Sequence, residues 1–157
     1  MLRTPLVPIV LATIVLGGCG GGGTKEPPPG NGPAFSPVIA NELRAIAPDC
    51  KLERTGATER RDCTGRYGTV QIATTGGRLT ALVIAMPPKI LPEAKGHIGS
   101  ALLGTLGAKG VEQLIESMSK LEIGQQIELT IGTAHALVSA GGTQRIAPEY
   151  SVGLSWP

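Results

Sequence analysis

Cysteine and histidine are the residues of this sequence whose side chains most readily carry chemistry, and they are few. The chain has three cysteines, Cys19, Cys50 and Cys63, and two histidines, His97 and His135. Neither histidine has an acidic or histidine partner at metal-ligand spacing, so we interpret both as exposed polar side chains. The interval between Cys50 and Cys63 is too long for a Cys-x-x-Cys redox motif. The sequence therefore predicts no catalytic residue, no metal and no cofactor.

Two further patterns superficially indicate catalysis or phosphate binding. Ser117 and Lys120 have the Ser-x-x-Lys spacing of penicillin-recognising enzymes, but the chain is short, lacks Lys-Thr-Gly, and carries both residues near the end of an amphipathic helix. The glycines at 104, 107 and 110 match neither the dinucleotide fingerprint nor a P-loop, because Lys109 is followed by Gly110 rather than Ser or Thr. We interpret the first pattern as helix surface and the second as turns.

The N-terminus has the architecture of a signal peptide. Arg3 supplies a positive charge, and an almost wholly apolar run from Pro5 to Leu16 follows it. This run is shorter than the roughly 20 residues that a membrane-spanning helix needs, and its prolines weaken it further as a permanent span. The sequence therefore predicts that residues 1–18 are removed.

The residues at the end of this run resemble the lipobox of bacterial lipoproteins. Leu16, Gly17, Gly18 and Cys19 provide an aliphatic residue, two small residues and a cysteine. The resemblance covers only this motif and its context. It implies cleavage before Cys19, a diacylglyceryl thioether on the sulfur and a further acyl chain, such as palmitate, on the new amino terminus. Several acyl chains anchor a protein stably, whereas one chain binds a membrane only marginally.

Gly20 follows the lipidated cysteine, where an aspartate would resemble an inner-membrane retention signal. In a Gram-negative cell the resemblance therefore implies the periplasmic face of the outer membrane. The alternatives are an ordinary secretory signal with an incidental cysteine, and an uncleaved anchor. Residues 19–35 form the lipidated N-terminus and a tether, since 20–33 are rich in glycine and proline and would span roughly 20 Å as a coil.

Export would bring the chain into an oxidising compartment, where disulfides form. Apart from Cys19, Cys50 and Cys63 are the two remaining cysteines. A hairpin that turns at Gly56 and Ala57 places these two cysteines directly opposite each other. The sequence therefore predicts a disulfide between Cys50 and Cys63 that stabilises a small domain.

The same hairpin concentrates positive charge, because five of the twelve basic residues of the predicted domain lie between Lys51 and Arg66. Its basic side chains alternate with acidic ones, as they do on many solvated surfaces. Because a disulfide would hold the hairpin rigid and arginine is favoured in anion recognition, we expect this element to meet a partner. The predicted partner-binding residues are Arg54, Arg60, Arg61 and Arg66.

Length, composition and net charge limit the number of domains and the kinds of partner that the chain can have. With 157 residues, the chain has room for one domain, predicted over 36–157. A hydrophobic content of 41% and a charged content of 17% indicate that most of it folds. The net charge of +2 and an aromatic content of 3% argue against nucleic acid as a partner.

Hydrophobic periodicity predicts helices and hairpins in alternation. Ser36 and Pro37 are typical of a helix start, and apolar residues at helical spacing continue to Pro48. After the disulfide hairpin, a second hairpin turns at Gly76 and Gly77. Residues 87–99 indicate a crossing loop, 102–106 a short helix broken near glycines 107 and 110, and 111–121 a second amphipathic helix.

Two more strands pair about a turn at Gly132 and Thr133, which sets Val138 opposite Ile127, and strict alternation from Tyr150 onwards indicates a last strand. Strands between helices predict an α+β fold, a small antiparallel sheet of hairpins packed against two amphipathic helices and carrying one disulfide.

These features predict a membrane-anchored envelope lipoprotein that acts as a non-enzymatic binding module, for example an inhibitor or a protective factor. Its expected partners are the membrane, through the acyl chains, and an envelope protein or an anionic envelope component. The alternative is a small hydrolase or transferase that acts on the envelope.

Overall fold

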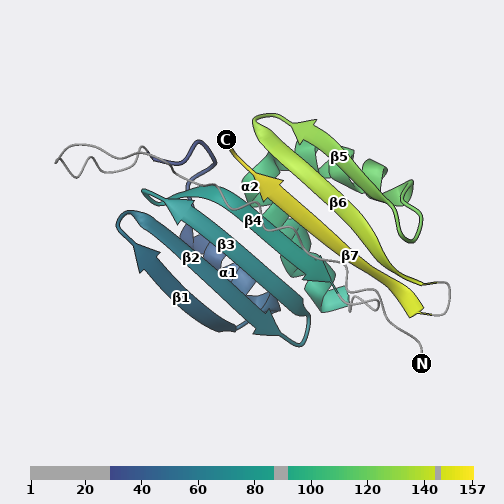
Figure 1. Cartoon of the computed structure of the whole chain (residues 1–157), viewed down its shortest axis with the longest axis horizontal. Coiled ribbons are helices and arrows are strands. Elements are labelled where there is room, and N and C mark those ends of the chain that lie inside the picture. Colours follow the sequence, from purple (N-terminus) through teal and green to yellow (C-terminus); the bar gives the residue numbers. More distant parts are fainter. Residues whose placement is uncertain (1–28, 87–91, 144–145) are drawn as a thin grey trace, which may run out of the picture.

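The computed structural model describes residues 29–86, 92–143 and 146–157. The predicted signal peptide, Cys19 and most of the tether lie outside the described residues. Figure 1 shows the elements in chain order. They are α1 (Pro37–Ile46), β1 (Asp49–Thr55), β2 (Thr58–Gly65), β3 (Gly68–Thr75), β4 (Arg78–Met86), α2 (Pro92–Ser119), β5 (Gln126–Ile131), β6 (Ala134–Thr143) and β7 (Ile146–Ser155).

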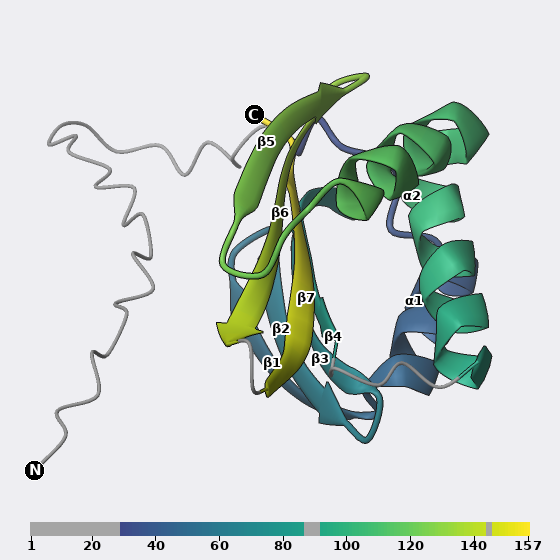
Figure 2. The same cartoon turned by 90° about the vertical axis from the view of Figure 1, so that its right-hand side faces the viewer.

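The strands form one seven-stranded antiparallel sheet in the order β1-β2-β3-β4-β7-β6-β5. It consists of a four-stranded meander and a three-stranded meander joined between β4 and β7. Figure 2 shows both helices on the same face of this sheet, so the domain has two layers. The structure thus confirms the predicted α+β class, the antiparallel hairpins and the two helices.

Helix α1 begins and ends where its sequence predicts. The Ser36 side chain accepts a hydrogen bond from the backbone N–H of Ile39 at 3.3 Å, and Pro37 occupies the first turn. Ile39, Leu43 and Ile46 form its buried stripe.

The two predicted hairpin registers are confirmed, and so is the predicted turn of the hairpin between them. Thr55 pairs with Thr58 across a turn at Gly56, and Cys50 faces Cys63. The turns at 76–77 and 132–133 likewise join β3 to β4 and β5 to β6. The glycines in these turns have positive φ, a conformation that costs other residues steric strain.

Helix α2 differs from the prediction. Residues 92–99, expected in a crossing loop, form its first turns. Ala94, Ile98, Ala101 and Leu102 are buried at helical spacing. Two of these side chains are alanines and glycines lie between them, so the apolar periodicity is weak in the sequence. The predicted break is confirmed at Gly107, where φ is 71°, whereas residue 110 remains helical.

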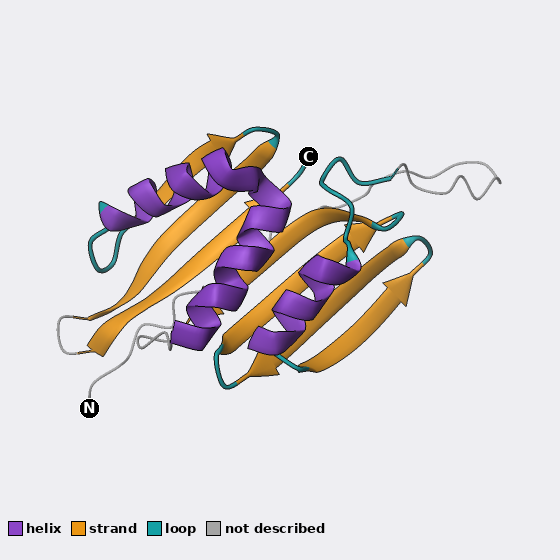
Figure 3. Ribbon diagram, turned by 180° about the vertical axis from the view of Figure 1, so that it is seen from behind, coloured by secondary structure: helices purple, strands orange, loops and turns teal. Residues whose placement is uncertain are grey.

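The core lies between the helices and the inner face of the sheet (Figure 3). Its largest fully buried side chains are Leu43, Ile46, Leu79, Leu82, Ile84, Leu114, Leu154, Val70, Val138 and Val152. Ordered contacts extend into the last part of the predicted tether, because Gly30 and Gly32 donate backbone hydrogen bonds to the carbonyls of Thr75 and Leu79, both at 3.1 Å.

Candidate functional site

The structure distributes the four predicted partner-binding arginines over different parts of the molecule. On the hairpin of β1 and β2, side chains alternate between the two faces of the sheet. Arg54 pairs with Glu59 across the strands and lies on the helix side, as does Arg61. Both guanidiniums contact the Glu59 carboxylate, at 2.8 Å and 3.1 Å. Arg61 also lies over the Phe35 ring, 5.2 Å from its centroid.

The other two arginines lie elsewhere. Arg60 is on the opposite face of the sheet, where its Nε is 3.2 Å from Asp62 Oδ2. Arg66 follows the end of β2, lies over the Tyr67 ring and is 3.6 Å from Glu93. The hydroxyl of Tyr67 donates to the same carboxylate at 2.7 Å. The four arginines therefore form no single surface, and each has a carboxylate partner that offsets its charge.

Glu59 is the carboxylate that both Arg54 and Arg61 contact on the disulfide hairpin. The hydrogen bond from Arg61 lowers the pKa of its carboxyl below the usual value of 4.5, and the charges of Arg54 and Arg61 act in the same direction. These pairs lie close to solvent, so their contribution to stability is small.

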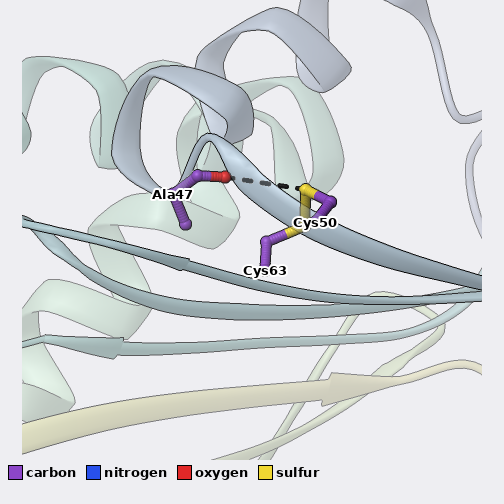
Figure 4. Close-up of a disulfide and its surroundings, with 3 residues drawn as sticks. All are labelled: Ala47, Cys50 and Cys63. Atoms are coloured by element: carbon purple, nitrogen blue, oxygen red, sulfur yellow. Dashed lines mark hydrogen bonds between the residues drawn. A yellow bond between two sulfur atoms is a disulfide. The ribbon is translucent and has the colours of Figure 1, made fainter.

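The predicted disulfide joins Cys50 and Cys63 (Figure 4), whose Cα atoms are 4.0 Å apart. Sγ of Cys50 lies 3.6 Å from the carbonyl oxygen of Ala47, and because a disulfide sulfur carries no proton this is a packing contact. Cys63 is buried against the core, whereas all seven residues of β1 are exposed. The bond therefore fastens an edge strand that buries little apolar surface of its own.

The histidines occupy two different environments. Nδ1 of His97 in α2 is 2.6 Å from Oε2 of Glu42 in α1. The sequence did not predict this partner, because the two residues are far apart in the chain and only the packing of the helices brings them together. His135 lies on β6 opposite Thr130, in the predicted register. It is exposed on the face of the sheet that is turned away from the helices.

Ser117 and Lys120 do not form a nucleophile and base pair. The Ser117 hydroxyl donates to the carbonyl of Gln113 at 2.9 Å, and the Lys120 ammonium contacts Glu116 at 2.7 Å. Both are interactions along one exposed helix surface, as the sequence predicts.

No described element covers the face of the sheet that is turned away from the helices (Figure 2). We call its central part the open face. It contains two adjoining depressions of about 510 Å³ and 210 Å³, which share Ala81 and Val83. The lining side chains that we define as the open face are Arg60, Gln71, Ala73, Ala81, Val83, Glu128, Thr130, His135, Leu137, Gly153 and Ser155.

The shape of the open face follows from the small residues at its centre. Ala81, Val83 and Gly153 lie on the neighbouring strands β4 and β7, where Val83 pairs with Gly153. A Cβ atom at Gly153 would lie 3.9 Å from a methyl group of Val83, so the absent side chain leaves a notch. Leu137, next to this notch, is 43% exposed. Polar and charged side chains surround this apolar centre. The alternation of apolar and polar residues in the strands predicts that one face of the sheet is exposed. The sequence does not show that both helices cover the opposite face.

Within the residues that the structure describes, no group of three or more His, Cys, Asp or Glu side chains is placed to bind a metal ion. No described helix combines the length and the apolar character needed to cross a membrane. Comparison of the chain with protein-family models, with curated proteins and with solved structures gave no match. We therefore infer function from the residues and their geometry.

Proposed function

We propose that the protein is an exported lipoprotein, anchored by acyl chains on Cys19, whose domain is a non-enzymatic binding module for another envelope protein. The resemblance of Leu16–Cys19 to a lipobox supports the anchor. The observation that carries the binding proposal is the open face, an uncovered sheet surface with an apolar centre and a polar rim.

This arrangement is typical of protein interfaces, which have an apolar centre and a polar rim. The rim carries charges of both signs, Arg60 with Asp62 on one side and Glu128 on the other, so a complementary partner also carries both. A projecting apolar side chain of the partner would fit the notch at Gly153.

A protein partner accords better with these charges than a polyanion does. Recognition of a polyanion depends on several cationic groups that converge on the ligand. Here Arg54 and Arg61 share one carboxylate, and Arg60 points to the other face of the sheet. The hairpin would then contribute to binding mainly through Arg60, on the rim of the open face.

One observation favours the alternative, a small envelope hydrolase or transferase. His135 and Glu128 line the same depression. They occupy diagonal positions on β5 and β6, where Cα atoms are roughly 7 to 8 Å apart, and no hydrogen bond joins their side chains in the described part of the chain. Loss of an envelope phenotype with His135→Ala and with Glu128→Gln, while partner capture persists, would favour an enzyme.

The binding proposal is tested by site-specific photocrosslinking in the cell that makes the protein. A photoreactive amino acid replaces Leu137 on the open face or, as a matched control, Leu103, which is 52% exposed on α2. We expect a discrete adduct from position 137 alone, and we expect Leu137→Glu to weaken that partner's capture while Leu103→Glu leaves it unchanged. Equal adducts from both positions, or none from position 137, would contradict the proposal.

A further inference from the structure

A second hollow lies on the helix side of the molecule, within the bend of α2. Gly107 divides α2 into two arms (Figure 3), and both arms contribute to the wall. The volume of the hollow is about 470 Å³, within the range of small-molecule binding sites. Its lining residues include Met86, Lys95, Gly99, Ile115 and Met118.

The bend and one glycine make this hollow. A straight helix would continue along the sheet, whereas the positive φ at Gly107 turns the second arm away from the direction of the first. Gly99 lines the hollow from the first arm, and a Cβ atom added there would meet no atom within 4 Å. The space beside Gly99 is therefore open, and a longer side chain at this position would fill it.

The chemistry of the wall points to an aliphatic ligand. Nearly all of the lining is hydrocarbon or thioether, and the two methionines, Met86 and Met118, are flexible side chains that adapt to an apolar guest. Ile115, at the margin, is 60% exposed, which is unfavourable for so large an apolar side chain in water. Binding of a hydrocarbon chain would remove this surface from water.

One cationic group lies at the edge of the hollow. Lys95 projects from the first arm, and within the described part of the chain no carboxylate is within 4.0 Å of its ammonium. An apolar cavity with a single cation at its margin is complementary to a molecule with one long hydrocarbon chain and one anionic end. A protein partner would instead need a contact surface of roughly 800 Å² on each side, much of it flat.

We propose that the bend of α2 binds the hydrocarbon chain of a long-chain fatty acid, whose carboxylate contacts Lys95. This inference stands independently of the binding function proposed for the open face, because it uses different residues on the other side of the sheet. It assigns two surfaces to the domain, one for a protein and one for a lipid.

The test is calorimetric titration of the full chain carrying Cys19→Ala, which removes the predicted acyl acceptor, with octanoate, decanoate and dodecanoate. Each added methylene that enters the hollow should lower the dissociation constant roughly fourfold. In the same background, Gly99→Phe should weaken dodecanoate binding at least about tenfold, because the ring occupies the space of the chain. Gly99→Leu should have a smaller effect in the same direction.

Gly96→Phe is the matched control. It lies on the same arm, a Cβ atom there also meets no atom within 4 Å, and it does not line the hollow. Circular dichroism should show that all variants are folded. Lys95→Gln should weaken binding of dodecanoate but not of dodecanol, which has the same chain without the charge, and dodecyl phosphate should bind no more tightly than dodecanoate.

The proposal is overturned if dodecanoate does not bind, if affinity does not rise with chain length, or if Gly99→Phe and Gly96→Phe bind equally. Tighter binding of dodecyl phosphate would overturn the carboxylate assignment and indicate a phospholipid headgroup instead.

Discussion

Removal of the disulfide should detach β1 while the rest of the sheet remains folded. The variant Cys50→Ser breaks the bond at its exposed end and leaves Cys63 in its buried position, so contacts with the core are kept. β1 contributes no buried side chain, and only its pairing with β2 and the disulfide hold it. The local opening of this strand should therefore become easier when the bond is removed.

The magnitude follows from the loop that the bond closes. A sequence separation of 13 corresponds to about 3 kcal/mol of chain entropy. Because every 1.4 kcal/mol is a tenfold change in an equilibrium constant, the open population of β1 should rise roughly 100-fold. Native-state hydrogen exchange measures this directly as faster exchange of the β1 amides.

The amides that pair β3 with β4 serve as the internal control, since these strands carry the buried residues Val70, Ile84 and Leu82. They should stay better protected than the β1 amides in both proteins, because they exchange only when the sheet itself opens. Reduction of the wild-type protein should reproduce the effect of Cys50→Ser. If exchange in β1 is unchanged, or if the β1 amides of Cys50→Ser are as well protected as those of β3 and β4, the disulfide does not hold the edge strand locally, and the inference is refuted.

The remaining predictions concern charge and close packing. Since the pKa of Glu59 is lowered, its carboxylate stabilises the fold fully above the usual value of 4.5 and progressively less as pH falls through the lowered pKa. Glu59→Gln should therefore lower the free energy of unfolding by less than about 1 kcal/mol at neutral pH and leave it unchanged well below that pKa, as measured by urea unfolding. An equal decrease at both pH values would contradict the pairing with Arg61. Gly32→Ala should destabilise the domain by about 1 to 3 kcal/mol, because its Cβ atom would overlap the carbonyl oxygen of Leu79. Gly96→Ala, in open space on a helix, should instead stabilise it by about 0.5 to 1 kcal/mol, and unfolding curves that show the same sign for both glycines would refute this reasoning.

Local patterns in the sequence predict most of the fold because hairpins and helix starts are fixed by nearby residues. The positions of Gly56, Gly76 and Gly132 determine three turns, and alternation then fixes which residues face each other. The same reasoning places Cys50 opposite Cys63. Ser36 and the residues that follow it define α1 in the same way.

The features that the sequence does not predict depend on tertiary packing. The first turns of α2 bury small residues, so their periodicity is faint, and the partner of His97 comes from another helix. Because side chains alternate along a strand, Arg54 and Arg60 are expected on opposite faces of the sheet. Which carboxylate each arginine contacts, and which face the helices cover, become apparent only in the structure. The open face and the hollow in α2 likewise arise from how the layers assemble.

Metabolic labelling with an alkyne-tagged fatty acid tests whether Cys19 carries the proposed acyl anchor. We predict that the wild-type protein and Cys50→Ala incorporate the label and remain in the membrane fraction, because Cys50 is not the acceptor. We predict that Cys19→Ala incorporates none and leaves that fraction, because the acceptor thiol is lost. Undiminished labelling of Cys19→Ala would contradict the account, as would a wild-type protein that keeps Met1 and carries no acyl chain.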